Sequence, residues 1–359
     1  MTHLPFLTKL KNMITLPDAA MIAALLSVSV FLPNKQLLAG EQQWSYLPIV
    51  GYVDTSPAVA DVDADGVQDI VLATTGGRVL VLDANGRMKW STDANQTISN
   101  PPTLAGTPLR IYVISNPGAV VCLDAKTGVK MWRYNMADGF PWGMTALAAA
   151  DIDGDGQAEI NAADKGGHLV CLGEDGAPIW TKNTKVSFNT APALSDLDGD
   201  GKSEILLGGE ETPLVCFSNK GTERWRVKKA QAVNSSPLVY DLQNDGAVEI
   251  LLGEGDGLSV YSNAGVQLWH HRMKSQVHDA ISIGDVDLDG KKDIIVVDLL
   301  GQVACLSADG TLQWQADVGR RVRRSPAIGD IDGDGAQEVV IGGYSDALHI
   351  FDAQGNQKE

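Results

Sequence analysis

Acidic residues recur in this sequence in short loops of one pattern, Asp-x-Asp-x-Asp-Gly-x-x-Asp or the same pattern ending in Glu. Five loops carry it in full: Asp61, Asp63, Asp65 and Asp69; Asp151, Asp153, Asp155 and Glu159; Asp196, Asp198, Asp200 and Glu204; Asp285, Asp287, Asp289 and Asp293; Asp330, Asp332, Asp334 and Glu338. A sixth loop keeps Asp241, Asp245 and Glu249 but has Gln243 at its third position. Carboxylates gathered so closely repel one another unless a cation lies between them. The pattern predicts five strong cation sites and one weaker site.

The spacing of these acids suits Ca²⁺, which takes six to eight oxygen ligands at about 2.3–2.6 Å. Carboxylates at the first, third and fifth positions of a curled loop point toward one centre. Glycine at the sixth position permits a left-handed turn, and the ninth position returns a carboxylate from the next strand. Mg²⁺ demands tighter octahedral geometry and keeps several waters. We therefore expect Ca²⁺ as the bound cofactor.

The overall composition excludes some partners. The formal net charge of −17 is spread along the chain, and a protein this acidic repels nucleic acid and anionic membranes. No Ser-His-Asp spacing, zinc motif or Gly-rich phosphate loop appears, and most carboxylates belong to the acidic loops. The sequence favours a protein without catalytic activity, although it leaves that question open.

The acidic loops also define a repeat. They start at Asp61, Asp151, Asp196, Asp241, Asp285 and Asp330, so the intervals are 90, 45, 45, 44 and 45 residues. The doubled first interval predicts one unit without a loop, near residues 100–112. Repeats of this length that are rich in short apolar runs are typical of propeller blades.

Each unit contains four short apolar runs separated by Gly, Asn and Asp, which predicts four strands joined by tight turns. The last run carries a tryptophan four residues after a turn glycine: Trp90, Trp132, Trp180, Trp225, Trp269 and Trp314. We expect these residues to pack between blades. Residues 41–359 are thus predicted to form an all-β, seven-bladed β-propeller of four-stranded blades.

The seventh unit has no tryptophan after its final turn, but Trp44 follows Gly40 by four residues. Residues 41–46 are therefore predicted to complete the last blade by pairing near residues 347–352. Residues 1–40 differ from the repeat: Lys9 and Lys11 precede an apolar run at 19–32, as in a secretory signal. We expect export to the periplasm, the cell surface or the medium, with either a cleaved signal peptide or an uncleaved N-terminal anchor.

Four cysteines occupy the same place in the third strand of their units: Cys122, Cys171, Cys216 and Cys305. Equivalent positions in neighbouring blades lie farther apart than the roughly 7 Å that a disulfide spans between Cα atoms. We expect buried, unpaired thiols.

The unit Ser-Pro-x-x-x-Asp-x-Asp-x-Asp-Gly-x-x-Asp-Ile-Val resembles the FG-GAP/VCBS repeats of integrin α-like propellers, although the Phe-Gly…Gly-Ala-Pro element is not intact. The segment from Leu123 to Trp132 resembles the Trp-bearing repeat of quinoprotein-like propellers. The resemblance implies structural calcium on one face and a ligand on the opposite face. A quinone cofactor is not expected, because the chain has no adjacent cysteine pair and the repeat accounts for its tryptophans.

Residues seven positions before the acidic loops are expected to surround the channel on the face opposite the calcium: Asp54, Met144, Asn189, Asn234, His278 and Arg323. Trp142, His270 and His271 lie near them in sequence, as do Arg320, Arg321 and Arg324. We expect Trp142, His278, Arg320 and Arg323 to contact a protein or glycan ligand. The favoured function is a monomeric, exported binding or adhesion module. The alternatives are a calcium-dependent polysaccharide lyase or other carbohydrate-active enzyme, and a scaffold in envelope assembly.

Overall fold

The computed structural model describes residues 51–358 and residue 45, except positions 54, 117, 137–145, 210–213, 228–232, 234, 279 and 344–347. Every regular element among these residues is a β-strand, and none is a helix able to cross a membrane. The chain divides into two compact units, Met1–Pro102 and Thr103–Glu359. The first described sheet lies in the first unit and six sheets lie in the second.

Each sheet is one repeat, and we number these blades 1 to 7 along the chain. Blade 1 contains β1 (Ala58–Ala60), β2 (Asp69–Ala73), β3 (Arg78–Leu82) and β4 (Met88–Asp93). Blade 2, which has no acidic loop, contains β5 (Thr103–Ala105), β6 (Arg110–Ser115), β7 (Ala119–Asp124) and β8 (Lys130–Asn135). Blade 3 contains β9 (Ala148–Ala150), β10 (Glu159–Ala163), β11 (His168–Leu172) and β12 (Pro178–Asn183).

The remaining blades repeat this arrangement. Blade 4 contains β13 (Ala193–Ser195), β14 (Glu204–Leu207), β15 (Leu214–Phe217) and β16 (Glu223–Val227). Blade 5 contains β17 (Leu238–Tyr240), β18 (Glu249–Glu254), β19 (Gly257–Ser262) and β20 (Gln267–Arg272). Blade 6 contains β21 (Ile281–Gly284), β22 (Asp293–Val297), β23 (Gln302–Ser307) and β24 (Leu312–Asp317). Blade 7 contains β25 (Ala327–Gly329), β26 (Glu338–Gly342) and β27 (Leu348–Phe351).

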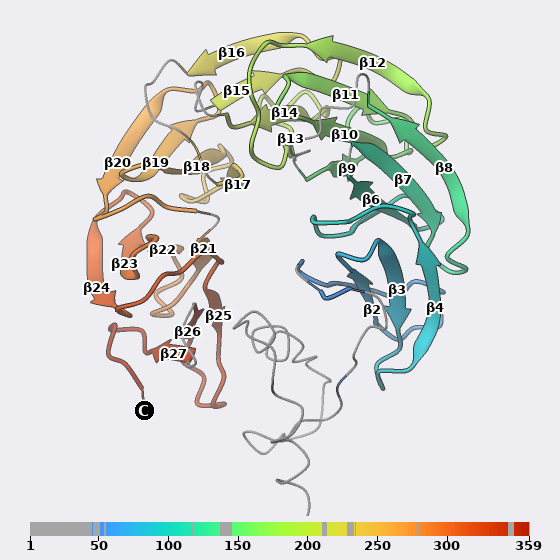
Figure 1. Cartoon of the computed structure of the whole chain (residues 1–359). Helices are drawn as coiled ribbons and strands as arrows, with labels where there is room; N and C mark the ends of the chain where they lie inside the picture. The colour runs from blue at the N-terminus through green and yellow to red at the C-terminus, as the bar shows by residue number, and fades with distance from the viewer. Residues whose placement is uncertain are drawn as a thin grey trace, which may run out of the picture. The chain divides into compact units, whose positions relative to one another are not determined.

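Strands within each blade pair antiparallel in chain order. In the second unit the first strand of each blade lies innermost, and in blades 2 to 6 the fourth strand lies outermost (Figure 1). The two middle strands are almost wholly buried, and their side chains form apolar clusters that span adjacent blades. This alternation of sheets and shared apolar clusters is how a propeller buries both faces of each blade. The prediction of an all-β, seven-bladed propeller is confirmed, including the blade without a loop.

The fourth-strand tryptophans pack against the next blade within the second unit. A Cβ atom on Gly176 would lie 2.5 Å from the ring of Trp132, so only glycine allows this approach. The same contact joins Gly221 to Trp180, Gly265 to Trp225, Gly310 to Trp269 and Gly355 to Trp314. The Trp132 indole N–H also donates to the carbonyl of Glu174 at 2.7 Å. The tryptophans therefore join consecutive blades, as their repeat position predicts.

Blade 7 has three strands among the described residues. After β27 the chain turns back, so that Gln357 bridges Phe351 and the Lys358 amide donates to the Ile350 carbonyl at 2.8 Å. Gln357 and Lys358 thus lie beside β27, where the fourth strand begins in the other blades. Apart from Ser45, residues 41–46 lie outside the described residues, and their pairing with this edge stays a prediction.

All four cysteines are buried and unpaired, as predicted. Cys122, Cys171, Cys216 and Cys305 each pair in register with the tryptophan of the fourth strand. Burial raises the pKa of each thiol to about 12. They are packing residues and are not nucleophiles at neutral pH.

Candidate functional site

The acidic loops join the first strand to the second strand in six blades. Glycine at the sixth loop position adopts the expected left-handed backbone in all of them, with φ from 83° at Gly201 to 91° at Gly335. The fourth position is also left-handed, which the sequence pattern did not predict. Two of these residues, Ala64 and Leu288, carry side chains that make this conformation costly.

One hydrogen bond recurs in all six loops. The ninth-position acid begins the second strand, is at most 5% exposed, and accepts the backbone amide of the second loop residue. In blade 3, for example, Ile152 N donates to Glu159 Oε2 at 2.9 Å. The first aspartate accepts the amide of the sixth-position glycine, as Asp151 does from Gly156 at 2.9 Å. These bonds fix the curl of the loop and bring its carboxylates together.

Three of the four predicted acids of a loop come together. One oxygen from each of three acids lies within 4.8 Å of the others in four loops: Asp61, Asp63 and Asp69; Asp151, Asp153 and Glu159; Asp196, Asp198 and Glu204; Asp285, Asp287 and Asp289. Carboxylate oxygens at this separation match the hard, oxygen-rich coordination that Ca²⁺ prefers. The donor set therefore fits a calcium ion.

The structure adds residues that the loop pattern did not contain. In blades 1 to 6, a β-bulge in the fourth strand displaces the residue before the tryptophan from the ladder. We call it the bulge residue: Lys89, Met131, Ile179, Arg224, Leu268 and Gln313 in blades 1 to 6, with Lys358 at the equivalent place in blade 7. A bulge re-aims its side chain. Here it can direct that side chain toward the acidic loop of the same blade.

Three bulge residues are cations that enter the loops. Lys89 Nζ lies 2.9 Å from Asp63 Oδ2 and 2.8 Å from Asp69 Oδ1. Arg224 contacts Asp198 and Glu204, each at 2.5 Å. Lys358 contacts Asp332 at 2.8 Å and Glu338 at 2.7 Å. The pKa of Lys358 rises because Asp332 and Glu338 accept its hydrogen bonds.

The bulge residues beside the other loops carry no charge. In blade 6 the neutral Gln313 amide donates to Asp293 Oδ1 at 2.7 Å. Blades 3 and 5 have the apolar Ile179 and Leu268, which are 56% and 48% exposed. In these three blades burial, followed by the neighbouring carboxylates, raises the pKa of the ninth-position acids Glu159, Glu249 and Asp293.

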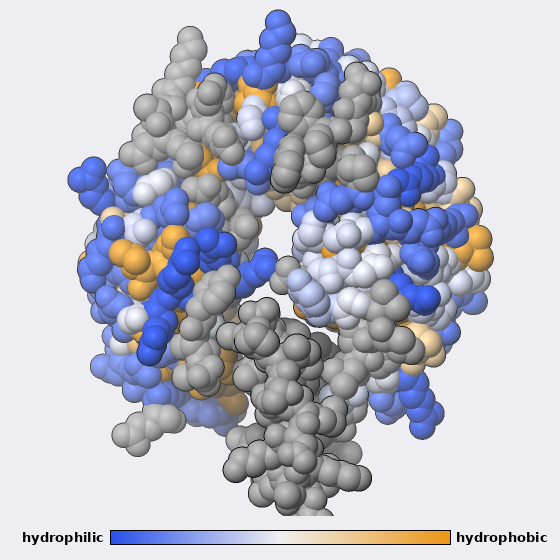
Figure 2. Space-filling view, in the orientation of Figure 1, coloured by the Kyte–Doolittle hydropathy of each residue, from blue (hydrophilic) through white to orange (hydrophobic). Residues whose placement is uncertain are grey.

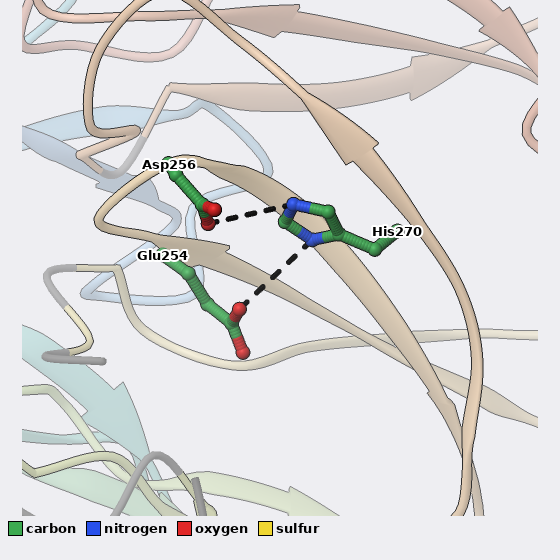
Figure 3. Close-up of side chains that lie close together, drawn as sticks. All are labelled: Glu254, Asp256 and His270. Atoms are coloured by element: carbon green, nitrogen blue, oxygen red, sulfur yellow. Dashed lines mark ion pairs between the residues drawn. The ribbon is translucent and has the colours of Figure 1, made fainter. Parts of the chain in front are cut away.

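A second cluster lies at the other end of blade 5, where β18 meets β19 (Figure 3). His270 on β20 lies between Glu254 and Asp256, with Nε2 3.4 Å from Asp256 Oδ1. Glu254 is fully buried and accepts hydroxyl hydrogen bonds from Tyr261 at 2.6 Å and Ser259 at 2.9 Å. Both Glu254 oxygens are thus satisfied, and the cluster anchors the hairpin. The sequence indicated His270 but not its two acidic neighbours.

The predicted ligand face lies at the strand ends opposite the acidic loops, because the second-to-third turns and the blade-to-blade connections share that end. His278 lies in the connection from β20 to β21, and the four arginines lie between β24 and β25. Both connections pack on the β22–β23 turn: Leu299 N donates to Gln276 O, and Val318 N donates to Gly301 O. The structure therefore brings these two predicted segments to one end of blade 6.

The arginine segment is held by a buried residue. Val322 is 1% exposed and belongs to the apolar cluster of blades 6 and 7, while Arg320, Arg321, Arg323 and Arg324 around it are exposed. None of the four forms an ion pair with any residue that the structure describes. Trp142, Met144, Asp54 and Asn234 lie outside the described residues, and Asn189 donates to the Val233 carbonyl at 2.8 Å.

Seven antiparallel sheets built from one repeat, with docked tryptophans between the blades of the second unit, define a β-propeller of the Trp-bearing, quinoprotein-like type. The sequence model of one family, outer membrane protein assembly factor BamB, matches residues 37–155, 118–198 and 165–359. The chain belongs to this family.

Individual relatives agree with this assignment. The outer membrane protein assembly factor BamB of Burkholderia pseudomallei is 36% identical over 131 residues, which is 36% of this chain; the match spans about a third (32%) of that relative's length. BamB from Moraxella catarrhalis superposes with a TM-score of 0.58 at 19% identity, over 84% of this chain and 83% of that one. The V. cholerae biofilm matrix protein Bap1 gives 0.66 at 15% identity, over 88% and 82%. The two structural likenesses concern the fold.

Proposed function

We propose that this protein is an exported, non-catalytic propeller that binds a protein partner during assembly of the outer membrane. The observation that carries the proposal is the match of the BamB family model across nearly the whole repeat region. The signal-like segment near residues 9–32 supports a location outside the cytoplasm. Adhesion, a glycan ligand and a monomeric state have no comparable support.

The partner surface that we propose is centred on the exposed arginines Arg320, Arg321, Arg323 and Arg324. Four guanidinium groups without ion-pair partners among the described residues are unusual on a chain of net charge −17. Arginine binds carboxylates through two parallel hydrogen bonds, so an acidic protein segment suits this surface. The face seen in Figure 2 is mostly hydrophilic, with apolar side chains of the described residues in separate patches.

We further propose that the acidic loops bind Ca²⁺ that stabilises the blades, as in FG-GAP/VCBS-type propellers. The converging carboxylates of blades 3 and 6, whose bulge residues carry no charge, support this most directly. The calcium would be structural, because its ligands come from one loop within one blade and lie away from the proposed partner surface.

Complementation tests the main proposal. Expression of the chain in a bacterium lacking its own BamB should restore the level of outer membrane β-barrel proteins. Arg320→Glu with Arg323→Glu should reduce that rescue, whereas the matched change of the exposed Arg87 and Arg133 to Glu should not. Full rescue by the charge-reversed protein would show that the partner binds elsewhere, and no rescue by a folded, exported wild-type chain would contradict the function.

A further inference from the structure

The six acidic loops share one backbone but differ in what faces their buried ninth-position acid. The contacts of the bulge residues identify the oxygen concerned. Arg224 Nη1 contacts Glu204 Oε1, Lys358 Nζ contacts Glu338 Oε1, and Gln313 Nε2 contacts Asp293 Oδ1. In each loop the other oxygen of the same carboxylate accepts the amide of the second loop residue. One oxygen therefore holds the loop together, and the other faces the bulge residue.

In blade 3 the corresponding oxygen, Oε1 of Glu159, has no donor among the described residues. Glu159 is 3% exposed, and its Oε2 accepts the Ile152 amide at 2.9 Å. No residue that the structure describes donates to Oε1. A ligand oxygen of Glu159 nevertheless lies within 4.8 Å of those of Asp151 and Asp153. Glu159 is thus a nearly buried carboxylate with no cation beside it among the described residues, and a cation among these three acids would offset the cost of burying its charge.

We propose that the bulge residue decides which acidic loops bind calcium. Blade 3 is the principal calcium site, through Asp151, Asp153, Asp155 and Glu159. The loops of blades 1, 4 and 7 are instead neutralised by cations of the chain itself, Lys89, Arg224 and Lys358. Blades 5 and 6 form an intermediate class. Blade 5 has an apolar bulge residue but Gln243 in place of a carboxylate, and blade 6 has all four acids but the neutral Gln313. A count of loop carboxylates alone gives a different order of calcium affinity, because it makes blade 5 the weakest site of all. The proposed order rests on the calcium part of the proposed function.

The physical basis is competition between cations for one space. An ammonium or guanidinium group within 3 Å of the same oxygens would face Ca²⁺ at close range. Like charges repel strongly at such short range, and Ca²⁺ carries two charges. A bulge cation should therefore weaken calcium binding at its own loop by at least about tenfold, which corresponds to about 1.4 kcal/mol.

Calorimetric titration of the metal-free whole protein with calcium chloride tests the division through a reciprocal exchange. Ile179→Lys should weaken the tightest calcium site by at least about tenfold. Arg224→Ile should add one site to the stoichiometry. Position 179 is exposed, so the lysine should be tolerated, and the melting temperature in chelator checks that each variant folds.

A matched pair of neutral substitutions supplies the control. Glu159→Gln and Glu204→Gln alter equivalent buried residues that make the same hydrogen bond to the loop. Only Glu159→Gln should remove a calcium site. If the wild-type protein binds no calcium, the calcium part of the proposed function fails together with this division. If it binds calcium but both exchanges and both Gln variants leave affinity and stoichiometry unchanged, the division alone is overturned.

Discussion

The acidic loops of blades 3 and 4 are near copies of each other, but the bulge residue beside each loop is different. Both place a buried glutamate at the ninth position, bonded to the second loop amide at 2.9 Å. Blade 4 then brings Arg224 from its bulge into the cluster, whereas blade 3 has Ile179 there, 56% exposed. A loop motif therefore specifies where carboxylates converge, while a neighbouring strand specifies which cation neutralises them.

The largest expected effect is the loss of thermal stability when calcium is removed. A ligand at a hundred times its dissociation constant stabilises the folded state by about 2.7 kcal/mol. We expect chelator to lower the melting temperature of the calcium-loaded protein by roughly 5 °C. In Glu159→Gln the difference between calcium and chelator should be clearly smaller, because only the weaker calcium sites remain. Equal melting temperatures of the wild-type protein in calcium and in chelator would show that calcium does not stabilise the fold.

Removal of a bulge cation should have the next largest effect. Lys89→Met leaves the carboxylate of Asp69, whose side chain is 1% exposed, without its cation. Loss of a charged partner from a buried group costs about 1–3 kcal/mol, so the variant should unfold at lower denaturant in the presence of chelator. Added calcium should recover most of that loss.

The matched control is Lys274→Met, which breaks the exposed pair with Asp317, about half exposed on both sides. Exposed pairs of this kind contribute about 0–1 kcal/mol. An equal loss of stability in both variants would show that Lys89 is no more than another surface charge.

These contacts mark the limit of what the sequence could predict. The blade boundaries followed from the 45-residue spacing, because a repeat fixes strands, turns and docked tryptophans together. The carboxylate clusters followed from the Asp-x-Asp-x-Asp-Gly pattern for the same local reason. The bulge residues were missed, although each directly precedes a conserved tryptophan position of the repeat, since a regular strand would point that side chain elsewhere.

The cluster of Glu254, Asp256 and His270 was missed for a different reason. It depends on cross-strand register between β18, β19 and β20, which places His270 opposite Ser259. Period and composition do not specify which side chains meet across strands. Local motifs were therefore predictable, and contacts that depend on a bulge or a register were not.

Acidification should have a smaller effect on stability, and the sign of that effect should depend on whether calcium is present. Burial and the adjacent carboxylates raise the pKa of Glu159 above its ordinary value, so the folded, metal-free protein binds this proton more tightly than the unfolded chain. In chelator, the contribution of Glu159 to stability should therefore increase as the pH falls through that raised pKa. In calcium the opposite holds, because the proton competes with the metal.

The measurement is the difference in melting temperature between calcium and chelator across this pH range. It should shrink as the pH falls in the wild-type protein, and in Glu159→Gln it should be smaller and change less with pH. A difference that is independent of pH would mean that the titrating carboxylate does not bind the metal.

The smallest expected effect concerns loop backbone strain. Leu288 occupies the left-handed fourth position of the blade 6 loop with φ of 60°, where blades 3, 4 and 7 have glycine. A left-handed residue with a Cβ costs roughly 1–2 kcal/mol, and glycine returns about 0.5–1 kcal/mol of that through its greater freedom when unfolded. Leu288→Gly should thus raise the free energy of unfolding by about 0.5–1 kcal/mol. Leu288→Ala keeps the Cβ and should give no such gain. Because Leu288 is 56% exposed, little apolar packing is lost in either variant. A gain from alanine equal to that from glycine would trace the effect to the side chain and would leave the shared loop backbone unstrained.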